Sequence, residues 1–227
     1  MNMLNIYDKW ENRKDMQILS FLKYDPCAKI IDLGCGNGEF STRVAEKTGS
    51  KEIYGIEVWK EFVKKSKDKG LKVIKSDLNG VLPFKNESFD VVVSNQVIEH
   101  LSYPIKFVSE IERILKNGGV SIISTENMSS WDNIISLILG WTPFSCEFDR
   151  FQKLGNPMSP HNNKSIDNYP PHMRIFAYRG LTDACEKMGF RITDIRGSGY
   201  IPFNFMSSID CRHSRFLTIK MVKEKQI

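Results

Sequence analysis

A tight glycine-rich turn is the feature of this sequence that most limits its fold. Residues 30–40 read Ile-Ile-Asp-Leu-Gly-Cys-Gly-Asn-Gly-Glu-Phe, so a β-branched run ends in an acidic residue and three alternating glycines follow. Glycine admits positive φ angles and lets a ligand approach the main chain closely. Doubly wound α/β sheets bind nucleotide-like cofactors at such a turn, between the first parallel strand and its helix.

The spacing of these glycines argues against a dinucleotide cofactor. A Gly-x-Gly-x-x-Gly fingerprint that starts at Gly34 requires glycine at position 39. The chain has Glu39 there, and its third glycine, Gly38, comes one residue earlier. Because a carboxylate inside the pyrophosphate turn would repel the phosphates, we do not expect NAD to bind.

Strand and helix patterns alternate as far as residue 124, which predicts parallel strands joined by right-handed crossovers. After Thr125 the sequence turns rich in Asn, Ser, Pro and aromatic residues, so we expect an insertion at 126–177. The length favours one domain over residues 1–227. The strands are expected at 29–33, 52–57, 71–75, 88–94, 120–124, 190–195 and 216–222, and the helices at 8–24, 39–48, 60–69, 104–115 and 181–188.

Acidic residues follow the second and third predicted strands. Glu57 ends an otherwise apolar strand, and a carboxylate there can accept hydrogen bonds from both hydroxyls of a ribose. Asp77 follows the next strand, where it can accept from an adenine amino group while Leu78 packs on the ring. The alternatives are a surface glutamate at position 57 and a turn or helix cap at position 77.

Four sequence blocks together resemble the class I S-adenosylmethionine-dependent methyltransferases. The first is Asp-Leu-Gly-Cys-Gly-Asn-Gly at 32–38, which is similar to motif I of that family. Leu-Pro-Phe at 82–84, Ser-Phe-Asp-Val-Val at 88–92 and Ile-Glu-His-Leu at 98–101 follow in the order and spacing typical of the family. The resemblance covers about residues 30–125.

The resemblance implies a doubly wound, seven-stranded and mostly parallel α/β sheet in the order 3-2-1-4-5-7-6, with the last strand antiparallel. It also implies S-adenosyl-L-methionine as the cofactor and S-adenosyl-L-homocysteine as its product. Asn95 is expected beneath the methionine moiety. The residues expected to bind the cofactor are Asp32, Gly34, Cys35, Gly36, Gly38, Glu57, Val58, Asp77, Leu78 and Asn95.

His100 is the candidate catalytic residue. It follows the fourth strand, where the acceptor should lie, and an imidazole titrates near neutral pH, as a general base must. The alternative is a histidine that only orients its loop or caps the next helix. Glu99 and His100 offer too few ligands for a metal ion, so no metal site is expected.

Residues 131–141 are apolar nearly all round a helix. Such a helix must be buried, join two subunits or touch a lipid-like ligand. We favour a cap over the substrate, ahead of a homodimer contact, with contact to a membrane surface last. Tyr7 and Trp10 form either an amino-terminal lid over the cofactor or the packing face of an extra helix.

Composition restricts the partners. The net charge of +5 is mild and much of it lies on one predicted helix at 60–69, so nucleic acid is not expected as a partner. Five cysteines without a Cys-x-x-Cys pair indicate reduced thiols. The first residues are too charged for a signal peptide, and together these features favour a cytoplasmic protein.

We therefore expect a methyltransferase that acts on an oxygen or nitrogen atom of a small molecule. A quinone-type or lipid-like acceptor is one alternative, because Ile-Glu-His-Leu at 98–101 also resembles ubiquinone-pathway O-methyltransferases. The other alternative is a non-catalytic, cofactor-binding regulator of a partner enzyme. It is suggested by a faint similarity of residues 55–57, 77–78 and 131–140 to the methionine-biosynthesis W protein.

Overall fold

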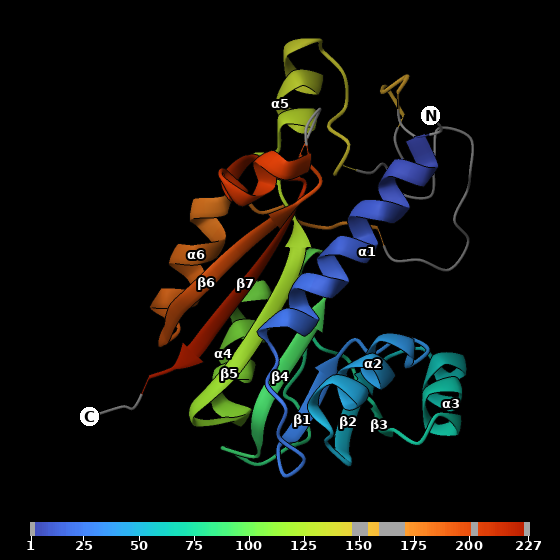
Figure 1. Cartoon of the computed structure of the whole chain (residues 1–227), viewed down its shortest axis with the longest axis vertical. Helices are drawn as coiled ribbons and strands as arrows, with labels where there is room; N and C mark the ends of the chain where they lie inside the picture. The colour runs from blue at the N-terminus through green and yellow to red at the C-terminus, as the bar shows by residue number, and fades with distance from the viewer. Residues whose placement is uncertain (1–2, 147–153, 159–170, 201–203, 225–227) are drawn as a thin grey trace.

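One mixed sheet of seven strands organises the protein (Figure 1). Its strands are β1 (Lys29–Leu33), β2 (Glu52–Glu57), β3 (Lys72–Lys75), β4 (Phe89–Asn95), β5 (Leu115–Glu126), β6 (Phe190–Ser198) and β7 (Phe216–Lys223). The strand order is β3-β2-β1-β4-β5-β7-β6. β7 is antiparallel to both β5 and β6, whereas the other neighbours pair in parallel. This arrangement confirms the expected fold class and strand order.

The computed structural model describes residues 3–146, 154–158, 171–200 and 204–224. Within these ranges the helices are α1 (Met3–Phe21), α2 (Glu39–Thr48), α3 (Lys60–Asp68), α4 (Pro104–Ile114), α5 (Trp131–Ile138) and α6 (Tyr178–Lys187). Short 3-10 turns lie at Ile98–His100, Asn204–Ser208 and Cys211–His213. The bounds of β1, α2 and β2 are those that the sequence predicts.

Helices cover both faces of the sheet, and each face has its own core. Successive residues of a strand point to opposite faces, so Ile30 joins the core with α1, α2 and α3, whereas Ile31 joins the core with α4 and α6. Both residues are fully buried. A sheet buried on both faces explains why its central strands read as continuous apolar runs.

β5 differs from its prediction because it begins directly after α4. The sequence favours a turn at Gly118 and Gly119, but both residues lie inside the strand. The register with β4 shifts here, from Phe89 opposite Leu115 to Val91 opposite Val120. The extra residues form a bulge, and the φ of +75° at Gly118 suits a residue without a side chain.

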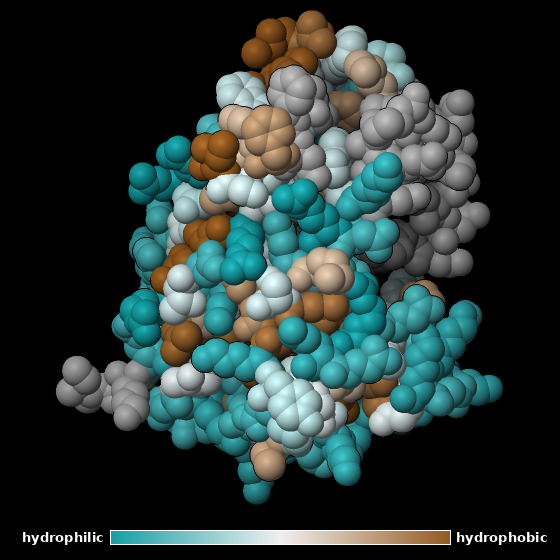
Figure 2. Space-filling view, in the orientation of Figure 1, coloured by the Kyte–Doolittle hydropathy of each residue, from teal (hydrophilic) through white to brown (hydrophobic). Residues whose placement is uncertain are grey.

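α5 buries its polar side and exposes apolar side chains, whereas an apolar helix is expected to bury its apolar side. Its buried residues are the polar Asp132, Asn133 and Ser136. Leu137 and Ile138 are 58% and 78% exposed, and Figure 2 shows hydrophobic surface at the end of the molecule where α5 projects. The polar face is held because the buried Arg215 pairs with Asp132 of α5 and with Glu126 of β5.

No helix among the described residues is long and apolar enough to span a bilayer.

Candidate functional site

The glycine turn between β1 and α2 has the backbone conformation that its sequence predicts. Gly34, Gly36 and Gly38 have φ angles of +83°, +52° and +81°. A side chain at Gly34 would lie 2.4 Å from Cγ2 of Val97, whereas a Cβ atom at Gly36 would meet nothing within 4 Å. The turn therefore packs closely against the protein at Gly34 and leaves open space beside Gly36.

Main-chain contacts attach this turn to β2. The amides of Gly34 and Cys35 both donate to the carbonyl oxygen of Ile56, at 2.9 and 3.0 Å. The Cys35 side chain is buried against Gly55, and burial raises the pKa of its thiol to about 12. The side chain of Cys35 is thus a core residue, and its main chain shapes the turn.

Glu57, the last residue of β2, lies beside the turn as expected. Its carboxylate is 7% exposed. Oε2 accepts from the amide of Gly36 at 3.0 Å, and Oε1 accepts from the amides of Val58 and Trp59 at 2.7 and 2.9 Å. These three donors compensate the buried charge and fix the carboxylate at the edge of a cavity.

This cavity has a volume of about 350 Å³ and lies over the carboxyl ends of the parallel strands. It brings together Gly34, Gly36, Glu57, Val58, Asp77, Leu78, Asn95 and His100. The sequence did not single out Trp59 and Phe62, two aromatic residues that also line it. Asp77 accepts from the amide of Asn79 through Oδ1 at 2.9 Å, so it stabilises its own turn as well as facing the cavity.

A second cavity of about 280 Å³ shares Gly34, Gly36 and Asn95 with the first. Asp32 from β1 and Arg43 from α2 line it, and α1 contributes Asp15. Asp15 accepts from Arg43 at 2.7 Å and from Asn95 Nδ2 at 3.0 Å. Sequence patterns gave no reason to place Asp15 or Arg43 here, because only the path of α1 across the sheet brings them together.

The Asp32 carboxyl is buried at the wall of the second cavity. Oδ2 accepts from the Ser41 hydroxyl at 2.5 Å, whereas Oδ1 is buried with no hydrogen-bond partner among the described residues. Burial raises the pKa of Asp32 to about 6, against the opposing effect of the Ser41 hydrogen bond. Such an orphaned acceptor suits a ligand that brings a hydrogen-bond donor or a positive charge.

The other end of the first cavity is built from the turn after β4. Gln96 has a φ of +57°, which is uncommon outside glycine and is typical of residues held in place for function. His100 lies four residues on, and its Nδ1 is 3.2 Å from the carbonyl oxygen of Pro171. Since a carbonyl oxygen only accepts, Nδ1 of His100 is the donor in this contact.

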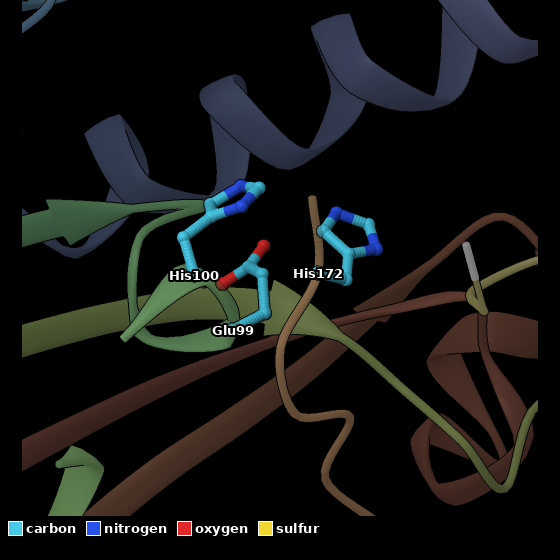
Figure 3. A group of neighbouring side chains, drawn as sticks. All are labelled: Glu99, His100 and His172. Atoms are coloured by element: carbon cyan, nitrogen blue, oxygen red, sulfur yellow. The ribbon is translucent and has the colours of Figure 1, made fainter. Parts of the chain in front are cut away.

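His100 lies next to two further titratable side chains (Figure 3). The His172 ring is 4.8 Å away between centroids, and Nδ1 of His172 contacts the carbonyl oxygen of Ser145 at 2.9 Å. Glu99 is fully buried, and burial raises the pKa of its carboxyl to about 7, with an opposing effect from His172. The sequence did not connect His172 with this turn.

The remaining sequence expectations fall outside the cavity. Trp10 packs against Gly199, and its carbonyl oxygen accepts from the Ser198 hydroxyl, which agrees with the packing alternative for α1. The Tyr7 side chain lies outside the described residues. The same applies to residues 147–153 and 159–170 of the insertion.

Comparison with known proteins agrees with this geometry. Residues 31–123, from β1 into β5, match the family model described as a methyltransferase domain. Residues 31–123 are thus a methyltransferase domain, similar to those of the class I S-adenosylmethionine-dependent methyltransferases. The cofactor of this family is S-adenosylmethionine, as the sequence predicts.

Two relatives carry names that state a reaction. A tRNA (carboxymethyluridine(34)-5-O)-methyltransferase of Arabidopsis thaliana is 30% identical over 68% of this chain and 37% of its own length. A mitochondrial ubiquinone biosynthesis O-methyltransferase of Candida albicans is 25% identical over 88% of this chain and 60% of its own. The chain spans between 37% and 60% of the length of the first curated relatives it matches.

A solved structure supports the fold. A chain from the complex of the Haloferax volcanii Trm112 methyltransferase activator with a methyltransferase superposes with a TM-score of 0.66. The two chains are 15% identical, and the match covers 97% of this chain and 93% of the other. At this identity the similarity shows the shared methyltransferase fold.

The residues of both cavities fit S-adenosylmethionine. The open side of Gly36 leaves room for a ligand against the main chain. The orphaned Oδ1 of Asp32 can accept from an ammonium group, and the Glu57 carboxylate retains lone pairs for hydroxyl groups. Acidic acceptors at both places match a ligand with an amino-acid end and a ribose.

Exchange of Gly36 for alanine should weaken cofactor binding. Alanine at a positive φ costs about 1–2 kcal/mol of stability, and its methyl group would occupy the space where the ligand approaches. We expect the affinity for S-adenosylhomocysteine, measured by calorimetry, to fall at least about 10-fold, or about 1.4 kcal/mol.

Gly70→Ala is the matched control for this variant. Gly70 has a φ of +87° with nothing within 4 Å of its Cβ position, and it does not line either cavity. The Gly70→Ala variant should lose about as much stability as Gly36→Ala and keep the wild-type affinity for S-adenosylhomocysteine. Equal loss of affinity in both variants would contradict a ligand beside Gly36.

Asp32 should make the stability of the ligand-free protein depend on pH. With its pKa raised from 3.8 to about 6, folded Asp32 holds a proton that the unfolded chain has released between these values. The free energy of unfolding therefore falls as pH rises through this window, by roughly 3 kcal/mol for this carboxyl.

The variant Asp32→Asn should lose this fall in the free energy of unfolding, which is measured by urea unfolding at several pH values between 4 and 6. Asp68→Asn, at the exposed end of α3, is the control and should keep it. A slope that is the same in Asp32→Asn and in the wild type would show that burial does not perturb Asp32.

Proposed function

We propose that this protein transfers the methyl group of S-adenosylmethionine to an oxygen or nitrogen atom of a small molecule. The observation that carries the proposal is one cavity with the buried carboxylate of Glu57 at one end and His100 at the other. The first end has the chemistry to hold an adenosine, and the second offers a titratable side chain near the expected acceptor.

We assign the residues of the two cavities to parts of the cofactor. Glu57 would accept from the ribose hydroxyls, and Asp77 and Leu78 would face the adenine. Asp32 and Asn95 would face the amino-acid end, with Asp15 and Arg43 around it. When bound, the cofactor supplies a methyl group on a positively charged sulfur, and the carbon–sulfur bond breaks as the bond to the acceptor forms.

The protein's own part in the reaction is to orient the acceptor and handle its proton. A hydroxyl or protonated amine must lose a proton before or during attack on the methyl group. His100 lines the cavity and its Nδ1–H donates to Pro171, so Nε2 is the nitrogen that would take the proton of the acceptor. Placement of the acceptor next to the methyl group supplies the rest of the catalysis.

The apolar face of α5 supports one alternative acceptor. Leu137 and Ile138 are exposed on this helix, which projects at one end of the molecule (Figure 1). A quinone-type or lipid-like acceptor would explain such a surface, and the Candida albicans relative is named for ubiquinone biosynthesis. Flotation with liposomes, compared between wild type and Leu137→Ser/Ile138→Ser, would detect the lipid contact.

Label transfer tests the proposal. The protein is incubated with S-adenosylmethionine labelled in the methyl group and with hydroxylated aromatics, amines, a quinol precursor in vesicles and tRNA. We expect label in a small molecule, together with S-adenosylhomocysteine. Label in tRNA alone, in line with the name of the Arabidopsis relative, would contradict a small acceptor. Binding of the cofactor without any transfer would identify a regulator.

His100→Asn separates the chemical role of His100 from a positioning role. The Asn amide stands where Nδ1 stood and can still donate to Pro171, but it has no counterpart of Nε2. We expect kcat to fall about 100-fold or more while the affinity for S-adenosylhomocysteine is unchanged. A kcat near that of the wild type would show that His100 only orients its loop.

A further inference from the structure

Three side chains with ligating atoms converge behind the acceptor end of the cavity. Glu99 and His100 come from the turn after β4, and His172 comes from the segment before α6 (Figure 3). One ligating atom from each lies within 4.8 Å of the others. From the sequence Glu99 and His100 were too few ligands, and the fold supplies the third from a residue far along the chain.

We propose that Glu99, His100 and His172 bind a divalent transition-metal ion such as Zn²⁺, Mn²⁺ or Fe²⁺. Two imidazoles and one carboxylate form a donor set that these ions accept, with at least one position left for another ligand. Mg²⁺ and Ca²⁺ prefer sites made of oxygen atoms, so they fit this set less well.

Both imidazoles are oriented as metal ligands usually are. Metal-bound histidines donate the N–H of their other nitrogen to a carbonyl or carboxylate group, which fixes the ring and its tautomer. Nδ1 of His100 contacts the carbonyl oxygen of Pro171 at 3.2 Å, and Nδ1 of His172 contacts that of Ser145 at 2.9 Å. In both rings Nδ1 therefore donates to a carbonyl oxygen, and Nε2 is the nitrogen that would bind the ion.

Main-chain hydrogen bonds hold the two ligand-bearing segments together without an ion. The carbonyl oxygen of Glu99 accepts from the amides of Met173 and Arg174, at 2.8 and 3.0 Å. The Glu99 carboxylate is itself oriented, since Oε2 accepts from the Thr125 hydroxyl at 2.9 Å. The site is thus preorganised by contacts that a metal does not have to create.

Buried negative charge around the cluster favours a cation. Glu99, Glu126 and Asp132 are each at most 5% exposed. Arg215, also buried, pairs with Glu126 and Asp132, and Glu126 Oε2 lies 3.9 Å from Nδ1 of His172, so this group of carboxylates reaches the proposed site. Removing carboxylates from water is costly unless a positive charge compensates them, and a divalent ion would do so.

Binding requires a small closure of the three side chains. Metal–nitrogen bonds of about 2.0–2.1 Å place tetrahedral ligand atoms about 3.4 Å apart. The ligating atoms now lie within 4.8 Å of one another, so binding requires them to approach by at most about 1.4 Å.

The role of the ion rests on the proposed function. His100 lines the cavity, and Glu99 and His172 lie next to His100 (Figure 3), so an acceptor hydroxyl in the cavity can become a further ligand. The ion then lowers the pKa of that hydroxyl, whose proton passes to solvent while its oxygen keeps the electron pair for attack. The ion would select oxygen acceptors, and Nε2 of His100 would be a ligand instead of the base.

Metal binding is tested on the full chain without donor or acceptor. Protein stripped with a chelator is titrated with Zn²⁺ by calorimetry and with Co²⁺, whose visible absorption reports a site of low coordination number. We expect one equivalent to bind, and the affinity to rise with pH because the imidazoles must lose their protons. Failure to bind one equivalent of either ion would overturn the proposal.

Matched variants locate the ion. His172→Asn keeps a donor for Ser145 and loses Nε2, and Glu99→Gln keeps an acceptor for Thr125 and loses the charge. Each should weaken Zn²⁺ binding at least about 10-fold and abolish the Co²⁺ absorption. His213→Asn, which alters a histidine that pairs with Asp210, should bind like the wild type.

Binding of S-adenosylhomocysteine to the same variants serves as the check on folding and on the proposed function. Variants that lose metal but keep this ligand support the site. Undiminished metal binding in Glu99→Gln and His172→Asn would overturn it, and a Glu99–His172 ion pair would then explain the cluster. If the wild type itself did not bind S-adenosylhomocysteine, that result would instead contradict the proposed function.

Discussion

The carboxylate of Glu57 joins the glycine turn to the turn after β2 and adds to the main-chain bonds that Gly34 and Cys35 make with Ile56. One of its oxygens holds the glycine turn through Gly36, and the other holds the turn between β2 and α3 through Val58 and Trp59. Because the carboxylate is buried, these charge-assisted hydrogen bonds are not in competition with water. Both walls of the cavity therefore have fixed positions before a ligand arrives.

Main-chain groups also position the side chains around His100, where the acceptor is expected to bind. The carbonyl of Pro171 sets the tautomer of His100, and the carbonyl of Glu99 holds the segment that carries His172. Polar groups whose geometry is fixed in advance do not have to reorganise during a reaction. A rigid cofactor end and a preorganised acceptor end suit a transfer that depends mainly on placement.

Local signals explain what the sequence could predict. A β-branched run followed by three alternating glycines specifies β1, its turn and the start of α2, and the bounds of these elements follow directly. Glu57 was recognisable because it ends an apolar strand. Asp15 and Arg43 were not, because their contact depends on α1 crossing the sheet. His172 was missed because hydrogen bonds across the fold bring it to His100.

α5 shows where a hydrophobic pattern is not sufficient. Its sequence is apolar nearly all round, so periodicity could not say which face is buried. Arg215 decides this, because its buried guanidinium pairs with Asp132 and turns the polar side of the helix inward. Which side of α5 is buried therefore depends on Arg215, which precedes β7. A local sequence pattern around α5 cannot contain this residue.

The most direct test of the central claim compares S-adenosylhomocysteine with an analogue that lacks both ribose hydroxyls. Calorimetry measures both ligands on the wild type, on Glu57→Gln and on Glu52→Gln, a change at the opposite end of β2. If Glu57 holds the ribose, removal of the hydroxyls weakens binding to the wild type and to Glu52→Gln, but much less to Glu57→Gln. Equal affinity of the wild type for the two ligands would contradict the claim.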